Sequence, residues 1–136
     1  MKKIVLLLML FVISASVFPK NFFKSYLMHG LWVLQPSGMY ALSFDNRNMR
    51  LGVSNGKEYK FITKKYYVSY QKVENFDPQY VGRGRRGNYI VFQDTLKTNN
   101  NIKYVTRNYR IKDLKNRTCL ILLIGNKEYT LKYEGR

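Results

Sequence analysis

The feature that most constrains the fold is a two-residue alternation of apolar and polar side chains in short segments along the chain. Residues 40–44, 49–53 and 129–133 each place a large apolar residue at every second position. This period is typical of a strand that turns one face toward a core. The polar run 45–48 and the pair Asn55-Gly56 follow the first two segments, and both compositions favour tight turns.

Further strand candidates follow along most of the chain. They cover residues 28–35, 58–63, 66–71, 88–93, 102–111 and 118–124. We count about eight or nine strands at roughly ten-residue spacing, which predicts an antiparallel sandwich or barrel. Helical patterns of crossover length are missing between them, and this disfavours a parallel sheet. One short helix is expected over residues 21–27. Lys57, Lys64 and Lys65 are interpreted as hairpin charges that protect sheet edges.

The N-terminus has the three parts of a secretory signal. Lys2 and Lys3 precede an uncharged run from Ile4 to Ile13, and Ser14-Ala15-Ser16 follows. The run is shorter than the roughly 18 residues that a membrane span needs. We therefore predict a signal peptide over residues 1–16 and one domain over residues 17–136. The mature protein is expected to be soluble and either periplasmic or secreted.

The charge balance is strongly basic. Lys and Arg number 24 against 8 acidic residues, which gives a net charge of +16. Such a protein attracts nucleic acid, anionic glycans and lipid headgroups. The basic residues are also spread along the whole chain, however, and a solvated basic surface explains that distribution equally well.

The densest basic motif lies in residues 82–87, where glycines alternate with Arg83, Arg85 and Arg86. Arginine forks suit phosphate, sulfate and carboxylate groups, and the glycines would let backbone amides approach an anion. Tyr80 and Tyr89 flank the motif and would stack on a base or a sugar ring. The motif is therefore a candidate anion-binding site, with a solvated loop as the alternative.

Side chains suited to catalysis or metal binding are scarce. The chain has one histidine, His29, and one cysteine, Cys119. These are too few for a His/Cys metal site, and any Ser-His-Asp arrangement would need His29, which has no partner motif nearby. A phosphate-binding loop of the P-loop type does not occur. We therefore expect no enzyme activity, no metal and no cofactor. Cys119 opens an apolar run and is expected to be buried.

Gly30 and Trp32, placed on the first strand after a short helical turn, resemble the first-strand motif of lipocalins and related calycins. The order of segments 109–114, 120–124 and 132–133 is similar to that in small secreted lipocalin-like proteins of bacteria. The resemblance implies that Gly30 lets the chain enter the barrel closely and that Trp32 closes the base of the barrel.

Together these observations predict an all-β, lipocalin-like antiparallel meander barrel of about eight strands with a short N-terminal helix. The expected function is non-enzymatic binding of a small apolar or amphipathic ligand inside the barrel. The alternative is a side-chain-filled barrel whose basic surface binds an anionic glycan, a lipid headgroup or nucleic acid. A third reading is a protein that docks an acidic partner. An interior void favours the first, and a solid core with clustered arginines outside favours the second.

Overall fold

The computed structural model describes residues 22–28 and 30–135. The predicted signal peptide over residues 1–16 and the expectations for His29 lie outside the described residues. Within the described part, no helix is long and apolar enough to cross a membrane.

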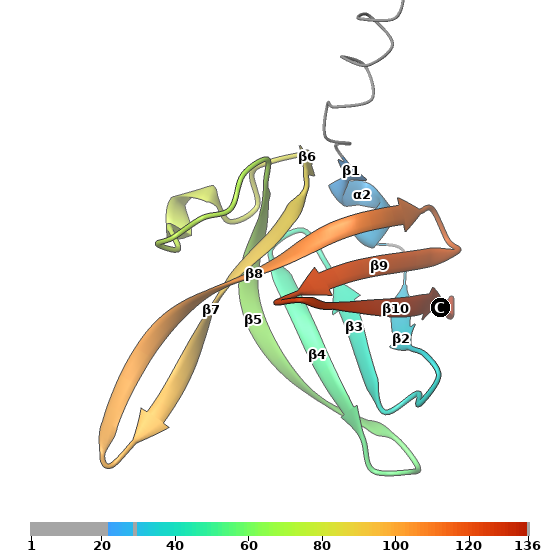
Figure 1. Cartoon of the computed structure of the whole chain (residues 1–136), viewed down its shortest axis with the longest axis horizontal. Coiled ribbons are helices and arrows are strands. Elements are labelled where there is room, and N and C mark those ends of the chain that lie inside the picture. Colours follow the sequence, from blue (N-terminus) through green and yellow to red (C-terminus); the bar gives the residue numbers. More distant parts are fainter. Residues whose placement is uncertain (1–21, 29, 136) are drawn as a thin grey trace, which may run out of the picture.

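Eight antiparallel strands form a closed barrel, and each strand pairs with the next barrel strand along the chain (Figure 1). The last barrel strand pairs with the first barrel strand and closes the barrel, so the prediction of an all-β antiparallel meander barrel is confirmed. The barrel strands are β2 (Leu31–Leu34), β3 (Tyr40–Phe44), β4 (Asn48–Ser54), β5 (Tyr59–Ser69), β7 (Tyr89–Thr98), β8 (Asn101–Lys115), β9 (Cys119–Ile124) and β10 (Lys127–Tyr133).

Four small elements of the described residues lie outside the barrel. Strand β1 (Phe22–Phe23) pairs with β6 (Arg86–Gly87), and a 3₁₀ turn, η1, covers Pro78–Tyr80. The expected helix over residues 21–27 is not supported at that length. The described residues hold a single turn, α2 (Lys24–Leu27), which has no side-chain hydrogen bond at its N-cap.

Polar side chains close the turns that the sequence predicts. The Asp45 carboxylate accepts hydrogen bonds from the amides of Arg47 and Asn48 at 2.8 and 2.7 Å, between β3 and β4. The Asn55 side-chain oxygen accepts hydrogen bonds from the amides of Lys57 and Glu58, just before β5 begins. These bonds satisfy turn amides locally, and this explains why such residues favour turns.

Strand β5 differs from the sequence-based expectation. Residues 58–63 and 66–71 were predicted as separate strands with Lys64 and Lys65 in a hairpin, but β5 runs without a break from Tyr59 to Ser69. Lys64 continues the row of inward-facing positions, and its ammonium group lies 3.3 Å from the Asp94 carboxylate. That ion pair explains how a lysine is accommodated in the middle of a strand.

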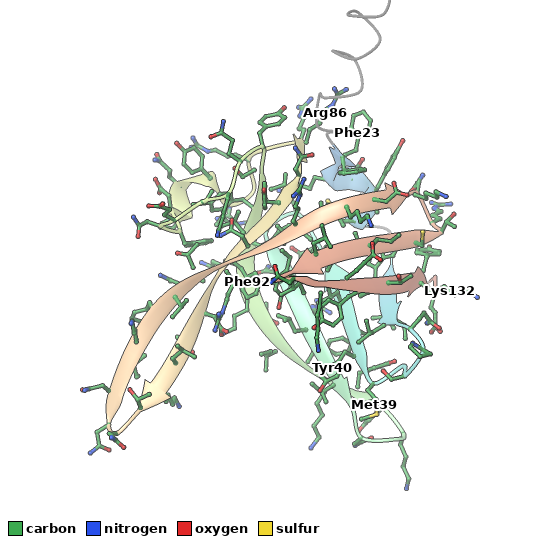
Figure 2. The ribbon with its side chains drawn as sticks, viewed as in Figure 1. Phe23, Met39, Tyr40, Arg86, Phe92 and Lys132 are labelled. Carbon is green, nitrogen blue, oxygen red and sulfur yellow. The ribbon has the colours of Figure 1, made fainter. Side chains whose placement is uncertain are left out.

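The barrel is packed at one end only. Trp32, Tyr66, Phe92, Met49 and Leu120 lie in one fully buried cluster, and Leu27 of α2 covers it. We call this the closed end. Toward the opposite end the inner face of the barrel becomes exposed, and we call that end the mouth. Figure 2 shows Phe92 in the interior and Tyr40 near the mouth.

Strands β7 and β8 extend beyond the barrel as a two-stranded ribbon (Figure 1). The β5–β7 ladder reaches only from Ser69↔Tyr89 to Tyr66↔Phe92, and the β8–β9 ladder begins at Arg110↔Leu123. Residues 93–98 and 101–106 therefore pair only with each other, and we call them the β7–β8 arm. Asn99 and Asn100 form its tip with positive φ values of 39° and 71°.

Candidate binding sites at the two ends of the barrel

The mouth of the barrel contains an apolar cleft of about 550 Å³. Its volume lies in the range of small-molecule sites, which typically run from roughly 300 to 1,000 Å³. Inward-facing positions of seven strands line it, among them Leu34, Tyr40, Leu51, Ile62, Ile124 and Tyr129. The cleft exists because the large buried side chains gather at the closed end and leave the inner face of the mouth uncovered.

Basic side chains lie within and beside this apolar cleft. Lys60 is the one charged side chain among the described residues that line it. Next to the cleft, where the β7–β8 arm leaves the barrel, Asp94 lies 3.3 Å from the Lys64 ammonium and 3.5 Å from Arg107 Nε. Two cations share one carboxylate there, so the rim of the mouth is positively charged on this side.

The Asp94 carboxylate is held in its ionised form by its neighbours. Partial burial alone would raise its pKa, but a hydrogen bond from the Thr95 amide and the interactions with Lys64 and Arg107 outweigh that effect. The pKa of Asp94 is consequently lower than its ordinary value of 3.8.

Trp32 lies at the closed end with none of its surface exposed. Its indole Nε1 donates a hydrogen bond of 2.9 Å to the Leu27 carbonyl at the end of α2. Its ring meets Tyr133 edge-on, with the ring centroids 5.5 Å apart. The indole thus joins α2 to β10 across the end of the barrel and satisfies its own donor there.

Gly30 permits this packing by leaving room for an aromatic ring. A Cβ atom at Gly30 would come within 2.9 Å of Tyr133 Cε1 and within 3.3 Å of the Gly135 carbonyl carbon. Real Cβ atoms essentially never show contacts below 3.0 Å, so the Tyr133 ring would have to shift to admit a larger residue. The described residues thus provide a physical reason for glycine two positions before the tryptophan.

Lys24 covers the closed end from α2 and is almost fully buried. Its ammonium group donates to the Asn46 backbone carbonyl at 2.5 Å and to Asn46 Oδ1 at 2.9 Å, and it lies 5.5 Å from the centre of the Tyr66 ring. Burial lowers the pKa of Lys24; the Asp45 carboxylate opposes this and the Arg47 guanidinium adds to it.

A basic cleft of about 780 Å³ lies outside the closed end, between α2 and residues 82–86. Arg83, Arg85 and Arg86 line it together with Lys24, and no acidic side chain is among its described lining residues. The Arg86 guanidinium lies over the Phe23 ring at 4.3 Å, and Figure 2 shows these two side chains together beside β1 and β6. The basic motif is therefore held against the barrel by β1 and α2.

The structure brings only one of the two candidate tyrosines, Tyr80, beside part of the arginine motif. Tyr80 packs against Tyr67, with ring centroids 5.6 Å apart, in a separate cleft that Arg85 and Arg86 also border. Tyr89 lines a third cleft with Lys72 and Arg110 and is not near Arg83 in any of these clefts. Tyr89 lies apart from the motif because β6 pairs with β1 outside the barrel, whereas Tyr89 is the first residue of the barrel strand β7.

Sequence reasoning missed the residues that α2 and β1 contribute to the basic cleft, among them Phe23 and Lys24. They lie in the segment interpreted only as a short helix, and they reach residues 82–86 through the pairing of β1 with β6. A two-residue strand carries no readable period, so the sequence offered no signal for this contact.

Cys119 is half-buried and free rather than fully buried. Leu120 and Leu122 face the core, so position 119 alternates onto the outer surface. Within the part of the chain that the structure describes, no three His, Cys, Asp or Glu side chains are grouped to hold a metal ion.

The chain matches no protein-family model, no curated protein and no solved structure. The resemblance to lipocalins therefore stays a prediction that depends on Gly30 and Trp32.

Proposed function

We propose that this protein is a non-enzymatic, exported binding protein that holds an amphipathic ligand with an acidic head group in the mouth of its barrel. The observation that carries the proposal is the apolar cleft of about 550 Å³, which opens above a fully packed closed end. A rigid packed base with an unfilled, apolar opening is the usual form of a small-molecule site in a barrel.

The charge at the mouth supports an acidic head group. Lys60 lines the otherwise uncharged cleft, and Lys64 and Arg107 add a net positive charge at its rim after Asp94 is counted. An apolar chain would lie along Leu51 and its neighbours, while a carboxylate or sulfate would meet the basic side chains.

The test is displacement of a fluorescent apolar probe by dodecanoate and by dodecylamine. Dodecanoate should bind more tightly because its head group is acidic. Ile62→Glu places a charge inside the cleft and should weaken dodecanoate binding by about tenfold or more.

Ile102→Glu is a matched control for that variant. Ile62 is 59% exposed and Ile102 is 57% exposed, but Ile102 lies on the β7–β8 arm and does not line the cleft. The control should bind dodecanoate like the unaltered protein. Equal binding by both variants, or no displacement of the probe by either compound, would refute the mouth as the ligand site.

A second candidate function is anion binding in the basic cleft. It is favoured by the grouping of Arg83, Arg85 and Arg86 around one cleft that has no acidic side chain among its described residues. The ligand would be an anionic glycan, a lipid headgroup or nucleic acid.

Heparin chromatography separates a site from a general charge effect. Replacement of the three arginines with Ser should lower the salt concentration needed for elution more than the same change at Lys57, Lys97 and Lys127. Those lysines are exposed and lie away from the cleft. Equal loss with both triple variants would mean that only net charge matters.

A further inference from the structure

Strand β5 has an unpaired edge beside the mouth. Its ladder with β7 ends at Tyr66↔Phe92, whereas its ladder with β4 continues to Ser54↔Tyr59. Residues 59–65 are therefore hydrogen-bonded on one side only. Figure 1 shows the β7–β8 arm diverging from the β4–β5 hairpin along this stretch.

The free backbone groups of this edge can be assigned. In an antiparallel ladder, successive residues direct their N–H and C=O groups alternately toward one neighbouring strand and the other. The Asn55 amide donates to the Glu58 carbonyl and the Tyr66 amide donates to the Arg47 carbonyl, so even-numbered residues of β5 face β4. Phe61, Thr63 and Lys65 consequently direct their N–H and C=O groups into the space that β7 has left.

On the facing edge of β7, one backbone amide already donates a hydrogen bond to a side chain of the same strand. Thr98 and Asn101 enclose a two-residue turn and pair with each other, so odd-numbered residues of the β7 arm face β5. The Thr95 amide is one of these groups, and it donates to Asp94 Oδ1 at 2.9 Å. The same carboxylate binds Lys64 across the opening. The β5 edge, rather than the β7 edge, is therefore the one available to a partner.

The surroundings of the β5 edge are both basic and apolar. Lys60 and Lys65 lie on the strand itself, and Lys97 and Lys103 lie on the arm. Exposed apolar side chains flank it on both sides, namely Phe61, Ile62, Ile102 and Tyr104. Where β5 and β7 separate, Thr63, Lys65 and Gln93 line a cleft of about 360 Å³ together with Phe76 and Pro78.

We propose that the β5 edge over residues 59–65 binds an extended acidic segment of a partner protein by β-strand addition. Backbone hydrogen bonds to Phe61, Thr63 and Lys65 would supply affinity, as in other strand-addition complexes. Acidic side chains of the segment would pair with the lysines, and its alternate apolar side chains would contact Phe61 or Ile62. A second copy of this chain is a poor occupant because it carries the same lysines and a net charge of +16. Lys60 and Ile62 also line the mouth, but the inference rests on the strand edge and does not require a ligand there.

The test uses a short synthetic peptide of alternating Glu and Val, with the corresponding Lys and Val peptide as its control. Hydrogen exchange should slow at the Phe61, Thr63 and Lys65 amides when the acidic peptide is added. The Lys peptide should bind at least about tenfold more weakly because its charges oppose those of the site.

Two substitutions at one position separate the backbone from the side chain. Thr63→Pro removes an N–H that makes no bond within the barrel and should weaken binding of the acidic peptide about tenfold. Thr63→Val keeps the N–H and should change the affinity less than about twofold. Hydrogen exchange in the unaltered protein tests the proposal even if the proline variant does not fold.

Three results would overturn the proposal. The first is equal peptide affinity of the two Thr63 variants, both folded. The second is slow hydrogen exchange of the three amides in the absence of peptide, with the exchange becoming slower as the protein concentration rises. That result would identify a second copy as the occupant. The third is protection without peptide at every concentration, which would mean that the β7–β8 arm itself closes onto β5.

Discussion

Replacement of Trp32 with Ala should remove much of the stability of the fold. A tryptophan buries about 200 Å², and at about 25 cal/mol per Å² this burial contributes roughly 5 kcal/mol. Measured Trp→Ala changes in cores cost about 3–5 kcal/mol, out of a total of roughly 5–15 kcal/mol for a small domain. Because Trp32 is fully buried between α2 and β10, we expect Trp32→Ala to fold poorly or to melt far below the unaltered protein.

Trp32→Phe separates the hydrogen bond of the indole from its bulk. Phenylalanine keeps a ring beside Tyr133 but leaves the buried Leu27 carbonyl without its donor. An unpaired buried group costs about 1–3 kcal/mol, and 1 kcal/mol lowers Tm by roughly 4–8 °C in a domain of up to about 100 residues. The Tm of Trp32→Phe should therefore lie between the Tm of Trp32→Ala and that of the unaltered protein.

Thermal unfolding followed by circular dichroism measures both variants, since neither keeps a tryptophan for fluorescence. Tyr40→Ala is the control, because Tyr40 is 53% exposed at the mouth and its loss should cost less than about 1 kcal/mol. A Trp32→Ala melting curve that overlays the unaltered one would refute the role of Trp32 and the lipocalin resemblance with it.

Mass spectrometry of protein from its natural host should find an N-terminus near Val17; an intact Met1 in a cytosolic fraction would contradict export. Gly30→Ala should lower Tm, because the new Cβ meets Tyr133 at 2.9 Å, whereas an unchanged Tm would mean that the ring moves freely. Asp94 has a lowered pKa, so its stabilising contribution is complete above its ordinary value of 3.8 and is lost as the pH falls through the folded pKa. Urea titrations should show that Asp94→Asn loses less stability than the unaltered protein below about pH 4. The same pH dependence in both proteins would exclude Asp94 as a contributor to stability.

Period-two patterns were enough to predict the fold class. Segments 40–44, 49–53 and 129–133 became β3, β4 and β10, with Asp45 and Asn55 closing turns near where the sequence placed them. Such local features are readable because alternation and turn chemistry depend on residues close together in the chain. Lys64 was misjudged because Asp94, the residue that allows a lysine inside β5, lies far away in the sequence.

The arrangement of the candidate sites was decided by tertiary structure alone. Arg83, Arg85 and Arg86 could be singled out from composition, but their neighbours Lys24 and Phe23 come from the start of the described chain through the β1–β6 pairing. Whether the barrel is filled depends on where its large side chains gather relative to one another. The unpaired β5 edge likewise depends on where two ladders end. These are relations between distant segments, and no pattern within a single segment encodes them.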